Sequence, residues 1–552
     1  MHHLDRRARR AITPLALAAL VAAAAPAVAD AAGPRPRVDV RVKQRTLIVE
    51  GGRADDTIRL YSPAATPFNV VVALGLEGEV VVASVHRDRF DDVVVRGGDG
   101  NDLILVDEVP GEHVPFTDTE PTSIRGDGGH DVVSSGRGAE ELRGGAGRDV
   151  IDGNGGNDVI ALGAGDDQII WDPGDGSDTV EGGAGLDNMT FNGAAINESF
   201  AAAADGERLR FTRVQGNIVM DTDGVEEVTV NTLGGSDFTE VGDLSRTDVT
   251  VVGVDDGAIA GGDGPDAVVD TVSVVGTPRA DHFTLTGGAG LLHVQGPSTR
   301  VDVVDLSTLD ALNVITDRGA DTIDASGVAA DAAHLGLLSG AGNDLVLGGA
   351  GLDDVLAGPG RDVVDANRGD DRISLDEGDD EIIWDPGDGS DLVDGAAGFD
   401  VMTFNGAGGD EVMEASALDD GLIFTRDVGN IRMDTERLEQ LAVNALGGAD
   451  TVTVGDLSGT TVEIVAVDLA AVRGAPGADG VADHVVVRGT PGDDIITAFG
   501  AAGAARIDHL PWSIDIVNNE PLDLLTIDGN GGEDTIDTAG LGPDTIQPAP
   551  AP

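Results

Sequence analysis

A nine-residue period constrains this chain more than any other feature of its sequence. It runs from Gly126 to Thr190 with one two-residue interruption, and again from Ser339 to Thr403. The eighth position is apolar in every unit, and the sixth is acidic: Asp131, Glu140, Asp149, Asp158, Asp167, Asp178, Asp187, then Asp344, Asp353, Asp362, Asp371, Asp380, Asp391, Asp400. A pattern held this long excludes chance composition, even in a chain with 81 glycines.

The spacing inside each unit predicts a turn followed by a short strand. Glycines at the early positions permit backbone conformations with positive φ and leave carbonyl oxygens free. The end of the unit, with one apolar residue between two others, predicts a three-residue strand whose middle side chain points inward. Two units therefore form one coil, and successive coils stack by parallel pairing. The sequence predicts an all-β fold, a parallel β-roll or β-solenoid.

A carboxylate at the sixth position adds hard oxygen ligands, which suit Ca²⁺ because this ion accepts six to eight oxygens in flexible geometry. A site should lie between turns two units apart, so Asp131 should face Asp149, Asp149 should face Asp167, and Asp158 should face Asp178. Seven units allow at most five such pairs in each run. The candidate ligands are all fourteen sixth-position acids, together with Asp102 from a single unit at 97–105. The alternative is a solvated acidic face on an ordinary β-solenoid.

These runs resemble the nonapeptide repeats of the repeats-in-toxin (RTX), or haemolysin-type, calcium-binding proteins, whose motif is G-G-x-G-x-D-x-U-x. The resemblance covers about 130 residues of the chain directly. It implies a calcium-bound parallel β-roll.

The first residues predict export. Arginines within Arg6–Arg10 precede the apolar segment Ala11–Ala25, and Ala27-Val28-Ala29 forms a small-x-small cleavage site. This order is typical of a secretory signal peptide. The alternative is a membrane anchor, but Pro14 and Pro26 interrupt the segment. We therefore expect a soluble, extracellular mature protein.

The charge balance is strongly acidic, with 99 acidic against 34 basic residues and a formal charge of −65. It excludes binding to nucleic-acid phosphates and to an anionic membrane. Acidic composition also occurs in disordered chains, but here 41% of residues are hydrophobic and the apolar positions are periodic. Facing carboxylates ~5 Å apart repel by roughly 3 kcal/mol at an effective dielectric near 20. Without calcium the rolls should therefore resist folding, and with calcium the binding free energy becomes folding free energy.

A tandem duplication organises the rest of the chain. Trp171 maps to Trp384, and Phe211-Thr212-Arg213 maps to Phe424-Thr425-Arg426, each offset by 213 residues. Each copy contains a roll and a β-rich spacer, which predicts an elongated repeat protein. The expected segments are a signal peptide (1–29), an N-terminal β-rich module with one isolated nonapeptide (30–120), the first roll (121–190), a spacer (191–333), the second roll (334–403), its spacer copy (404–540) and a disordered Pro-rich tail (541–552).

The sequence offers little for catalysis. It has no HExxH, no G-x-S-x-G and no cysteine nucleophile. Trp171 and Trp384 could form sugar-binding platforms, although core positions are the simpler interpretation. The sequence therefore indicates a secreted, non-enzymatic calcium-binding repeat protein that folds on extracellular Ca²⁺. The alternatives are a cell-surface or matrix adhesin or layer component, and a polysaccharide-modifying enzyme.

Overall fold

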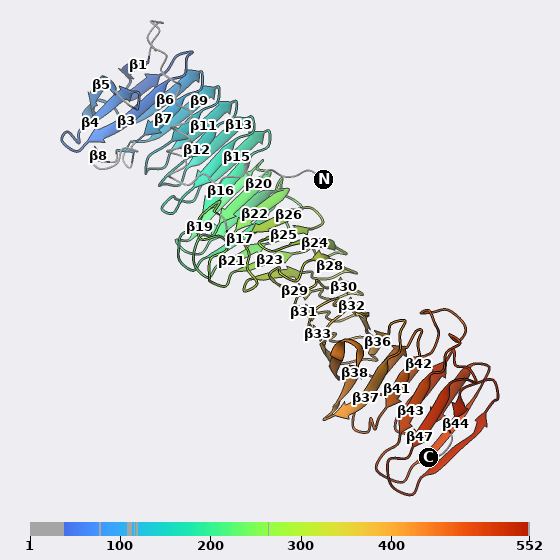
Figure 1. Cartoon of the computed structure of the whole chain (residues 1–552). Helices are drawn as coiled ribbons and strands as arrows, with labels where there is room; N and C mark the ends of the chain where they lie inside the picture. Colours follow the sequence, from blue (N-terminus) through green and yellow to red (C-terminus); the bar gives the residue numbers. More distant parts are fainter. Residues whose placement is uncertain are drawn as a thin grey trace. The chain divides into compact units, whose positions relative to one another are not determined.

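The computed structural model describes residues 38–76, 79–106, 113–114, 116–117, 120–262 and 264–549. The expected signal peptide and its cleavage site lie outside these residues. The chain divides into two compact units, Met1–Val274 with Gly290–Asp310, and Val275–Ala289 with Ala311–Pro552. Both are all-β (Figure 1), and the helices among the described residues are the short 3₁₀ turns η1 (Arg87–Arg89) and η2 (Val428–Asn430).

The first unit contains β1 (Asp39–Lys43), β2 (Thr46–Glu50), β3 (Thr57–Pro63), β4 (Asn69–Leu74), β5 (Val80–His86), β6 (Asp92–Asp99), β7 (Leu103–Val106), β8 (His113–Val114), β9 (Thr122–Gly128), β10 (Val132–Ser134), β11 (Glu141–Ala146), β12 (Val150–Asp152), β13 (Val159–Ala164), β14 (Gln168–Trp171), β15 (Thr179–Ala184), β16 (Asn188–Asn192), β17 (Ser199–Asp205), β18 (Arg208–Arg213), β19 (Ile218–Asp223), β20 (Glu227–Asn231), β21 (Phe238–Val241), β22 (Val251–Asp255), β23 (Thr271–Val275), β25 (Leu291–Gln295) and β26 (Arg300–Val304).

The second unit contains β24 (His282–Gly288), β27 (Ala311–Ile315), β28 (Thr322–Val328), β29 (His334–Leu338), β30 (Leu345–Leu347), β31 (Asp353–Leu356), β32 (Val363–Asp365), β33 (Arg372–Ser374), β34 (Glu381–Trp384), β35 (Leu392–Asp394), β36 (Val401–Asn405), β37 (Val412–Leu418), β38 (Gly421–Arg426), β39 (Ile431–Glu436), β40 (Gln440–Asn444), β41 (Thr451–Val454), β42 (Ile464–Asp468), β43 (His484–Arg488), β44 (Ile495–Ala501), β45 (Ala504–Asp508), β46 (Ser513–Val517), β47 (Leu524–Asp528), β48 (Thr535–Leu541) and β49 (Gln547–Pro548).

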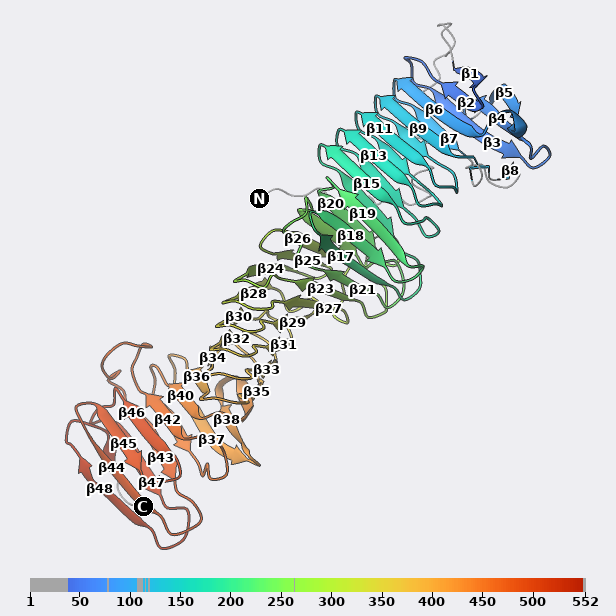
Figure 2. The ribbon, with the colours of Figure 1, turned by 180° about the vertical axis from the view of Figure 1, so that it is seen from behind.

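In the first run, alternate strands belong to two different sheets. β10, β12 and β14 pair in parallel in one sheet, while β9, β11, β13 and β15 pair in parallel in the other (Figures 1 and 2). Val132 pairs with Val150, and Val150 with Gln168, so each coil advances by two units. The predicted parallel β-roll is confirmed.

The core of each roll is formed by the eighth position of the units, as the period predicts. All of these side chains are buried between the two sheets: Val133, Leu142, Ile151, Ile160, Ile169, Val180, Met189, Val346, Val355, Val364, Ile373, Ile382, Val393 and Met402. Burying a side chain of this size stabilises the fold by about 1.5–3 kcal/mol. The apolar column therefore aligns the coils, and the acidic turns follow its register.

Strand length departs from the prediction on one side of the first roll. β10 and β12 have three residues, as expected, but β11, β13 and β15 have six. Gly145 pairs with Gly163 in the turn that follows the apolar residues. Gly145 has φ +126, a conformation that favours glycine, so the pairing continues into the turn.

The spacers continue the two sheets and add antiparallel hairpins. β17 and β18 pair antiparallel, as do β18 and β19, and β19 then pairs in parallel with β15. In the second unit β37, β38 and β39 repeat this arrangement with bounds shifted by 213 residues, as in Ser199 and Val412. The internal duplication is therefore structural. The segment boundaries expected from the sequence remain a prediction.

The expected disordered tail is wrong for residues 541–549. Thr545 and Ile546 are buried, and Gln547 in β49 pairs in parallel with Leu524 in β47. The physical reason is that the last described coil leaves an apolar end, which Ile546 covers. The proline-rich composition concealed this single anchoring residue. Residues 550–552 lie outside the described part of the chain.

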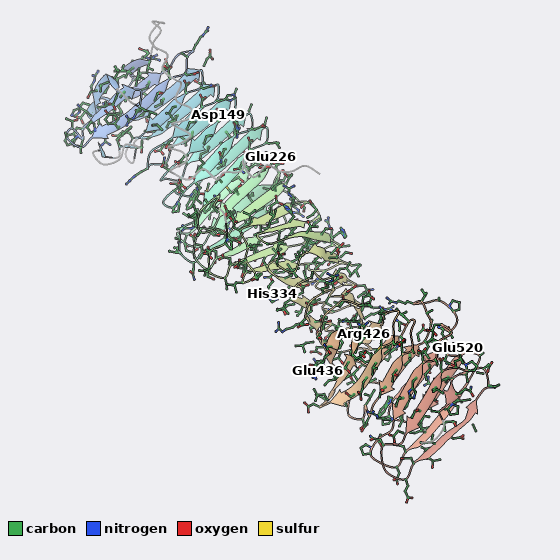
Figure 3. All side chains as sticks on the ribbon, in the orientation of Figure 1. Asp149, Glu226, His334, Arg426, Glu436 and Glu520 are labelled. Atoms are coloured by element: carbon green, nitrogen blue, oxygen red, sulfur yellow. The ribbon has the colours of Figure 1, made fainter. Side chains whose placement is uncertain are left out.

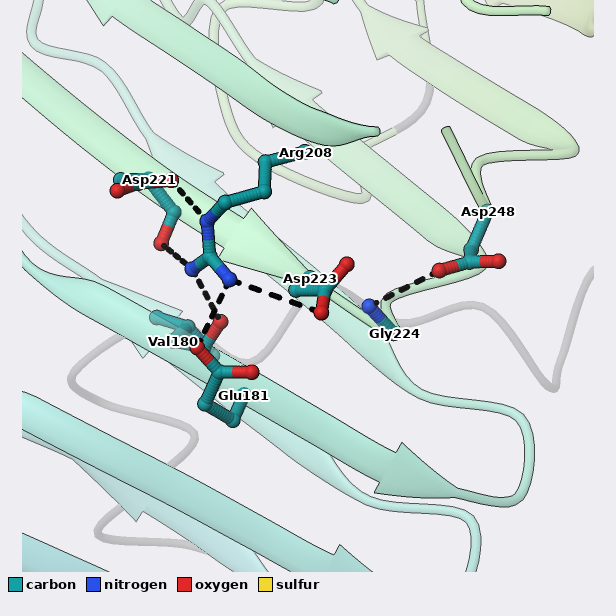
Figure 4. A network of polar contacts seen from close by, with 7 residues as sticks. All are labelled: Val180, Glu181, Arg208, Asp221, Asp223, Gly224 and Asp248. Atoms are coloured by element: carbon teal, nitrogen blue, oxygen red, sulfur yellow. Dashed lines mark hydrogen bonds and ion pairs between the residues drawn. The ribbon is translucent and has the colours of Figure 1, made fainter. Parts of the chain in front are cut away.

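An arginine on the first hairpin ties it to the roll (Figure 4). Arg208 donates to Asp221 on the neighbouring hairpin strand at 2.5 Å and to Glu181 in β15 at 2.8 Å. The second copy has Gly421 at the equivalent position. There Arg437 forms an ion pair with Asp394, the equivalent of Glu181. Both copies thus connect hairpin and roll through an arginine, from different positions.

Candidate metal centre

The sixth-position acids lie in columns at the turns, each directly before a strand. In the first column the backbone N–H of Asp131 donates to Oδ1 of Asp149 at 2.8 Å, and that of Asp149 donates to Oδ1 of Asp167 at 2.7 Å. Asp149 is labelled in Figure 3. The predicted pairing of acids two units apart is therefore present as a carboxylate ladder, in which each carboxylate accepts from the preceding coil.

The remaining rungs have the same geometry. In the first run they are Glu140–Asp158 at 2.7 Å, Asp158–Asp178 at 2.9 Å and Asp167–Asp187 at 2.9 Å. In the second run they are Asp344–Asp362 at 2.8 Å, Asp353–Asp371 at 2.8 Å, Asp362–Asp380 at 2.7 Å, Asp371–Asp391 at 3.0 Å and Asp380–Asp400 at 3.0 Å. Glu140 fits the ladder despite its longer side chain, because its backbone N–H makes the rung and Ser135 Oγ donates to its Oε2 at 3.1 Å.

Asp102 is not an isolated unit, which corrects the sequence interpretation. Its backbone N–H donates to Oδ1 of Asp131 at 2.8 Å, and its own Oδ1 accepts from the N–H of Asp56 at 2.7 Å. β7 pairs in parallel with β10. The intervening segment from 107 to 120 concealed this contact in the sequence, because the repeat period breaks there.

The second carboxylate oxygens of most ladder residues are buried without a hydrogen-bond partner. These oxygens are Oδ2 of Asp102, Asp131, Asp149, Asp158, Asp167, Asp187, Asp344, Asp362, Asp371, Asp380 and Asp400. An unpaired buried polar atom costs free energy comparable to a lost hydrogen bond, and more when it is charged. These oxygens are therefore the positions where a cation would be most stabilising.

Carbonyl oxygens from the next coil approach the same points. A Cβ added to Gly126 would lie 2.2 Å from Oδ2 of Asp131 and 2.6 Å from the carbonyl oxygen of Gly144. A Cβ on Gly144 would lie 2.6 Å from Oδ2 of Asp149 and 2.5 Å from the carbonyl oxygen of Leu162. Only glycine leaves room for these oxygens, so the turn collects hard oxygen ligands from two coils. This donor set fits calcium.

In the described parts of the chain, no three histidine, aspartate or glutamate side chains converge closely enough to hold a metal ion by themselves. An ion that accepts six to eight oxygens would therefore depend on backbone carbonyls for most of its ligands. The carboxylates would supply the charge.

Burial raises the pKa of the ladder carboxyls because the charged form is poorly solvated there. The neighbouring carboxylates add to this rise, whereas the backbone N–H donors oppose it. The raised values are about 6 for Asp102, Asp149, Asp178, Asp187, Asp344 and Asp391, about 7 for Asp131, Asp353, Asp362 and Asp400, about 8 for Asp371 and about 9 for Asp158. Without a cation, these turns favour protonated carboxyls.

Two ladder positions in the spacers carry their own cation, a feature that the sequence interpretation missed. Oε1 of buried Glu198 accepts from Arg213, and its Oε2 accepts from the N–H of Ala194 at 2.5 Å. In the second copy, Glu411 accepts from Arg426 (Figure 3) and from Ala407. The duplicated Phe-Thr-Arg triplet was the available sequence signal. Where an arginine is present, both carboxylate oxygens have partners.

Breaking this pair should destabilise the hairpin strongly. Replacing Arg426 by Met leaves the Glu411 carboxylate buried and uncompensated, so we expect a loss of about 3–5 kcal/mol. Chemical unfolding in saturating calcium measures the loss. As the control, the double variant E411L/R426M should lose much less, because it removes both charges. Equal unfolding midpoints for R426M and the unmodified chain would contradict this account.

The duplicated tryptophans belong to the core. Trp171 is 0% exposed and stacks on Phe191 at a centroid distance of 3.9 Å, and Trp384 stacks on Phe404 at 4.0 Å. The Arg213 guanidinium lies 5.5 Å from the Trp171 ring. The core interpretation is confirmed, because a buried indole cannot serve as a sugar platform.

The ladder geometry can be compared with known proteins. A family model described as the RTX calcium-binding nonapeptide repeat matches four segments, 123–139, 134–169, 337–364 and 348–382. The chain carries RTX calcium-binding nonapeptide repeats. The RTX matches lie within the two runs, whereas the carboxylate ladder extends beyond them, from Asp102 on one side to Asp400 on the other.

Other comparisons add little to the RTX match. No curated protein matches the chain. The solved structure of the extracellular lipase LipA from Serratia marcescens is similar at 13% identity, over 61% of this chain and 43% of the lipase chain, with a TM-score of 0.11. The similar region thus spans less than half of the lipase, and a score this low does not establish a common fold.

Proposed function

We propose that the chain is an exported, non-enzymatic repeat protein whose two RTX runs fold and stiffen when they bind extracellular calcium. The observation that supports this most strongly is the contrast between two kinds of ladder position. Glu198 and Glu411 have a buried arginine, and both of their carboxylate oxygens have partners. Most ladder positions without an arginine keep a buried oxygen with no partner. Calcium would supply there the positive charge that arginine supplies in the spacers.

The proposed ligands are the sixth-position carboxylates of both runs and Asp102, completed by carbonyl oxygens of the turns. Each run has five rungs, formed by its seven acids. One ion between the acids of each rung gives at most five ions per run, and one further rung joins Asp102 to Asp131. The carboxylates thereby become ligands instead of mutually repelling charges.

Export follows from the N-terminal segment and suits this chemistry. Extracellular calcium is abundant, and a chain without cysteine has no disulfides to stabilise it. Among the described residues, no helix has the length and apolar character needed to cross a membrane. The ladder carboxylates are held by backbone N–H groups inside the turns, which supports a structural role rather than a catalytic one.

Replacing one ladder carboxylate tests the ligand assignment. Asp149 takes part in two rungs, so Asp149→Asn should reduce the calcium bound per chain by one or two ions and lower the thermal midpoint. Native mass spectrometry counts the ions directly. The matched control is Asp127→Asn, which removes an exposed acid from the same turn region. An unchanged ion count in D149N, or an equal loss in both variants, would contradict the assignment.

A further inference from the structure

The carboxylate ladder continues through the first spacer, where no RTX unit is matched. The N–H of Glu198 donates to Oδ1 of Asp237 at 2.7 Å, and the N–H of Asp237 donates to Oδ1 of Asp270 at 2.8 Å. The N–H of Asp270 donates to Oδ1 of Asp310 at 3.0 Å. These rungs are 39, 33 and 40 residues apart, so their coils are longer than those of the rolls.

An additional carboxylate, Asp256, joins this ladder. It directly follows β22, is 2% exposed, and its Oδ1 lies 3.1 Å from Thr232 Oγ1. Its Oδ2 is buried and has no hydrogen-bond partner, and the same is true of Oδ2 of Asp237, which is 4% exposed. The negative charges of Asp270 and Asp310 act on Asp256. In the described part of the chain, no arginine, lysine or histidine forms an ion pair with any of these four acids.

The second spacer provides an internal comparison. It keeps the rungs Glu411–Asp450, Asp450–Asp483 and Asp483–Asp523, at 2.9, 2.8 and 3.0 Å. At the positions equivalent to Thr232 and Asp256 it has Ala445 and Leu469, both fully buried. The turn therefore forms with an apolar pair at this place. A carboxylate is not needed for the fold, so its retention in the first copy requires another reason.

We propose that Asp256, together with Asp237 and Asp270, binds a divalent cation in the first spacer, and that the second spacer lacks this site. A buried carboxylate without a counter-charge is strongly unfavourable, and the surrounding donors are hard oxygens. Carboxylates and carbonyl oxygens of the turn make calcium the best-suited ion, since it accepts many oxygens in flexible geometry. The Thr232 hydroxyl fixes the orientation of Asp256. This site is separate from the proposed RTX sites, because Asp256 belongs to no nine-residue unit.

The test uses the full chain and converts the first spacer to the residues of the second. The variant T232A/D256L should fold, because Ala445 and Leu469 form the same turn in the other copy. Native mass spectrometry in calcium should show one ion fewer per chain than the unmodified protein. The reverse variant A445T/L469D should bind one ion more. Asp256→Asn keeps the shape of the side chain and should also lose one ion.

The outcomes separate this site from the proposed function. An unchanged ion count in both T232A/D256L and D256N overturns the spacer site and identifies Asp256 as a protonated carboxyl hydrogen-bonded to Thr232. If D149N loses calcium in that case, the RTX proposal still stands. If D256N loses one ion while D149N loses none, the spacer site stands and the RTX ligand assignment fails. A chain that binds no calcium at all overturns both.

Discussion

Removing calcium at pH 8 should unfold both RTX runs, and restoring it should refold them. In the metal-free state the ladder places ionised carboxylates inside the turns, with most of their second oxygens unpartnered. A ligand that binds only the folded state stabilises it by about 4 kcal/mol per site at a thousandfold excess over Kd. Several sites therefore exceed the total stability of a typical domain, roughly 5–15 kcal/mol. Far-UV circular dichroism should show β structure lost in chelator and regained with millimolar calcium.

Magnesium provides the control for this experiment. It requires near-ideal octahedral geometry and gives up its water reluctantly, so the flexible, carbonyl-rich turns should recover little structure with it. The arginine-paired Glu198 and Glu411 suggest that part of each spacer keeps residual structure without metal. A metal-stripped chain as compact and heat-resistant as the calcium-loaded one would contradict the proposed function.

The local period predicted the roll because every coil repeats the same short-range instructions. An apolar residue at the eighth position must enter the core, so Val133 and Ile151 define the register, and Asp131 and Asp149 then necessarily meet. Fold class and rung pairs therefore follow from nine-residue spacing alone. The parallel pairing of neighbouring coils needs no further information, since every strand has equivalent neighbours.

Contacts across irregular segments could not be predicted in the same way. Asp102 reaches Asp131 across a segment without a period, and Arg213 reaches Glu198 only through a hairpin. Ile546 is one apolar residue in a proline-rich tail. Each depends on where a distant segment returns, which composition does not specify. The spacer ladder was missed because its rungs are more than 30 residues apart, a spacing without a visible repeat.

In the absence of metal, acid should stabilise the RTX runs and base should destabilise them. Burial raises the pKa of Asp131 to about 7, Asp371 to about 8 and Asp158 to about 9, whereas an unfolded aspartate titrates near pH 3.9. The folded metal-free state therefore binds more protons than the unfolded state between about pH 4 and the raised values. Stability must fall as pH rises through that window. Chelex-treated chain should be compact at pH 5 and expanded at pH 8.

Calcium should reverse this pH dependence, because protons and calcium compete for the same carboxylates. The loaded chain should be stable at pH 8 and should release ions as the pH falls toward 5, measured by ion count and size-exclusion chromatography at each pH. The high net charge could also expand the metal-free chain at pH 8 through general repulsion between exposed acids. Sodium chloride at 1 M screens exposed charges within about 3 Å but reaches buried carboxylates poorly. If salt alone restored compactness at pH 8, surface charge rather than the ladder would control folding; if only calcium or acid does so, the buried carboxylates are responsible.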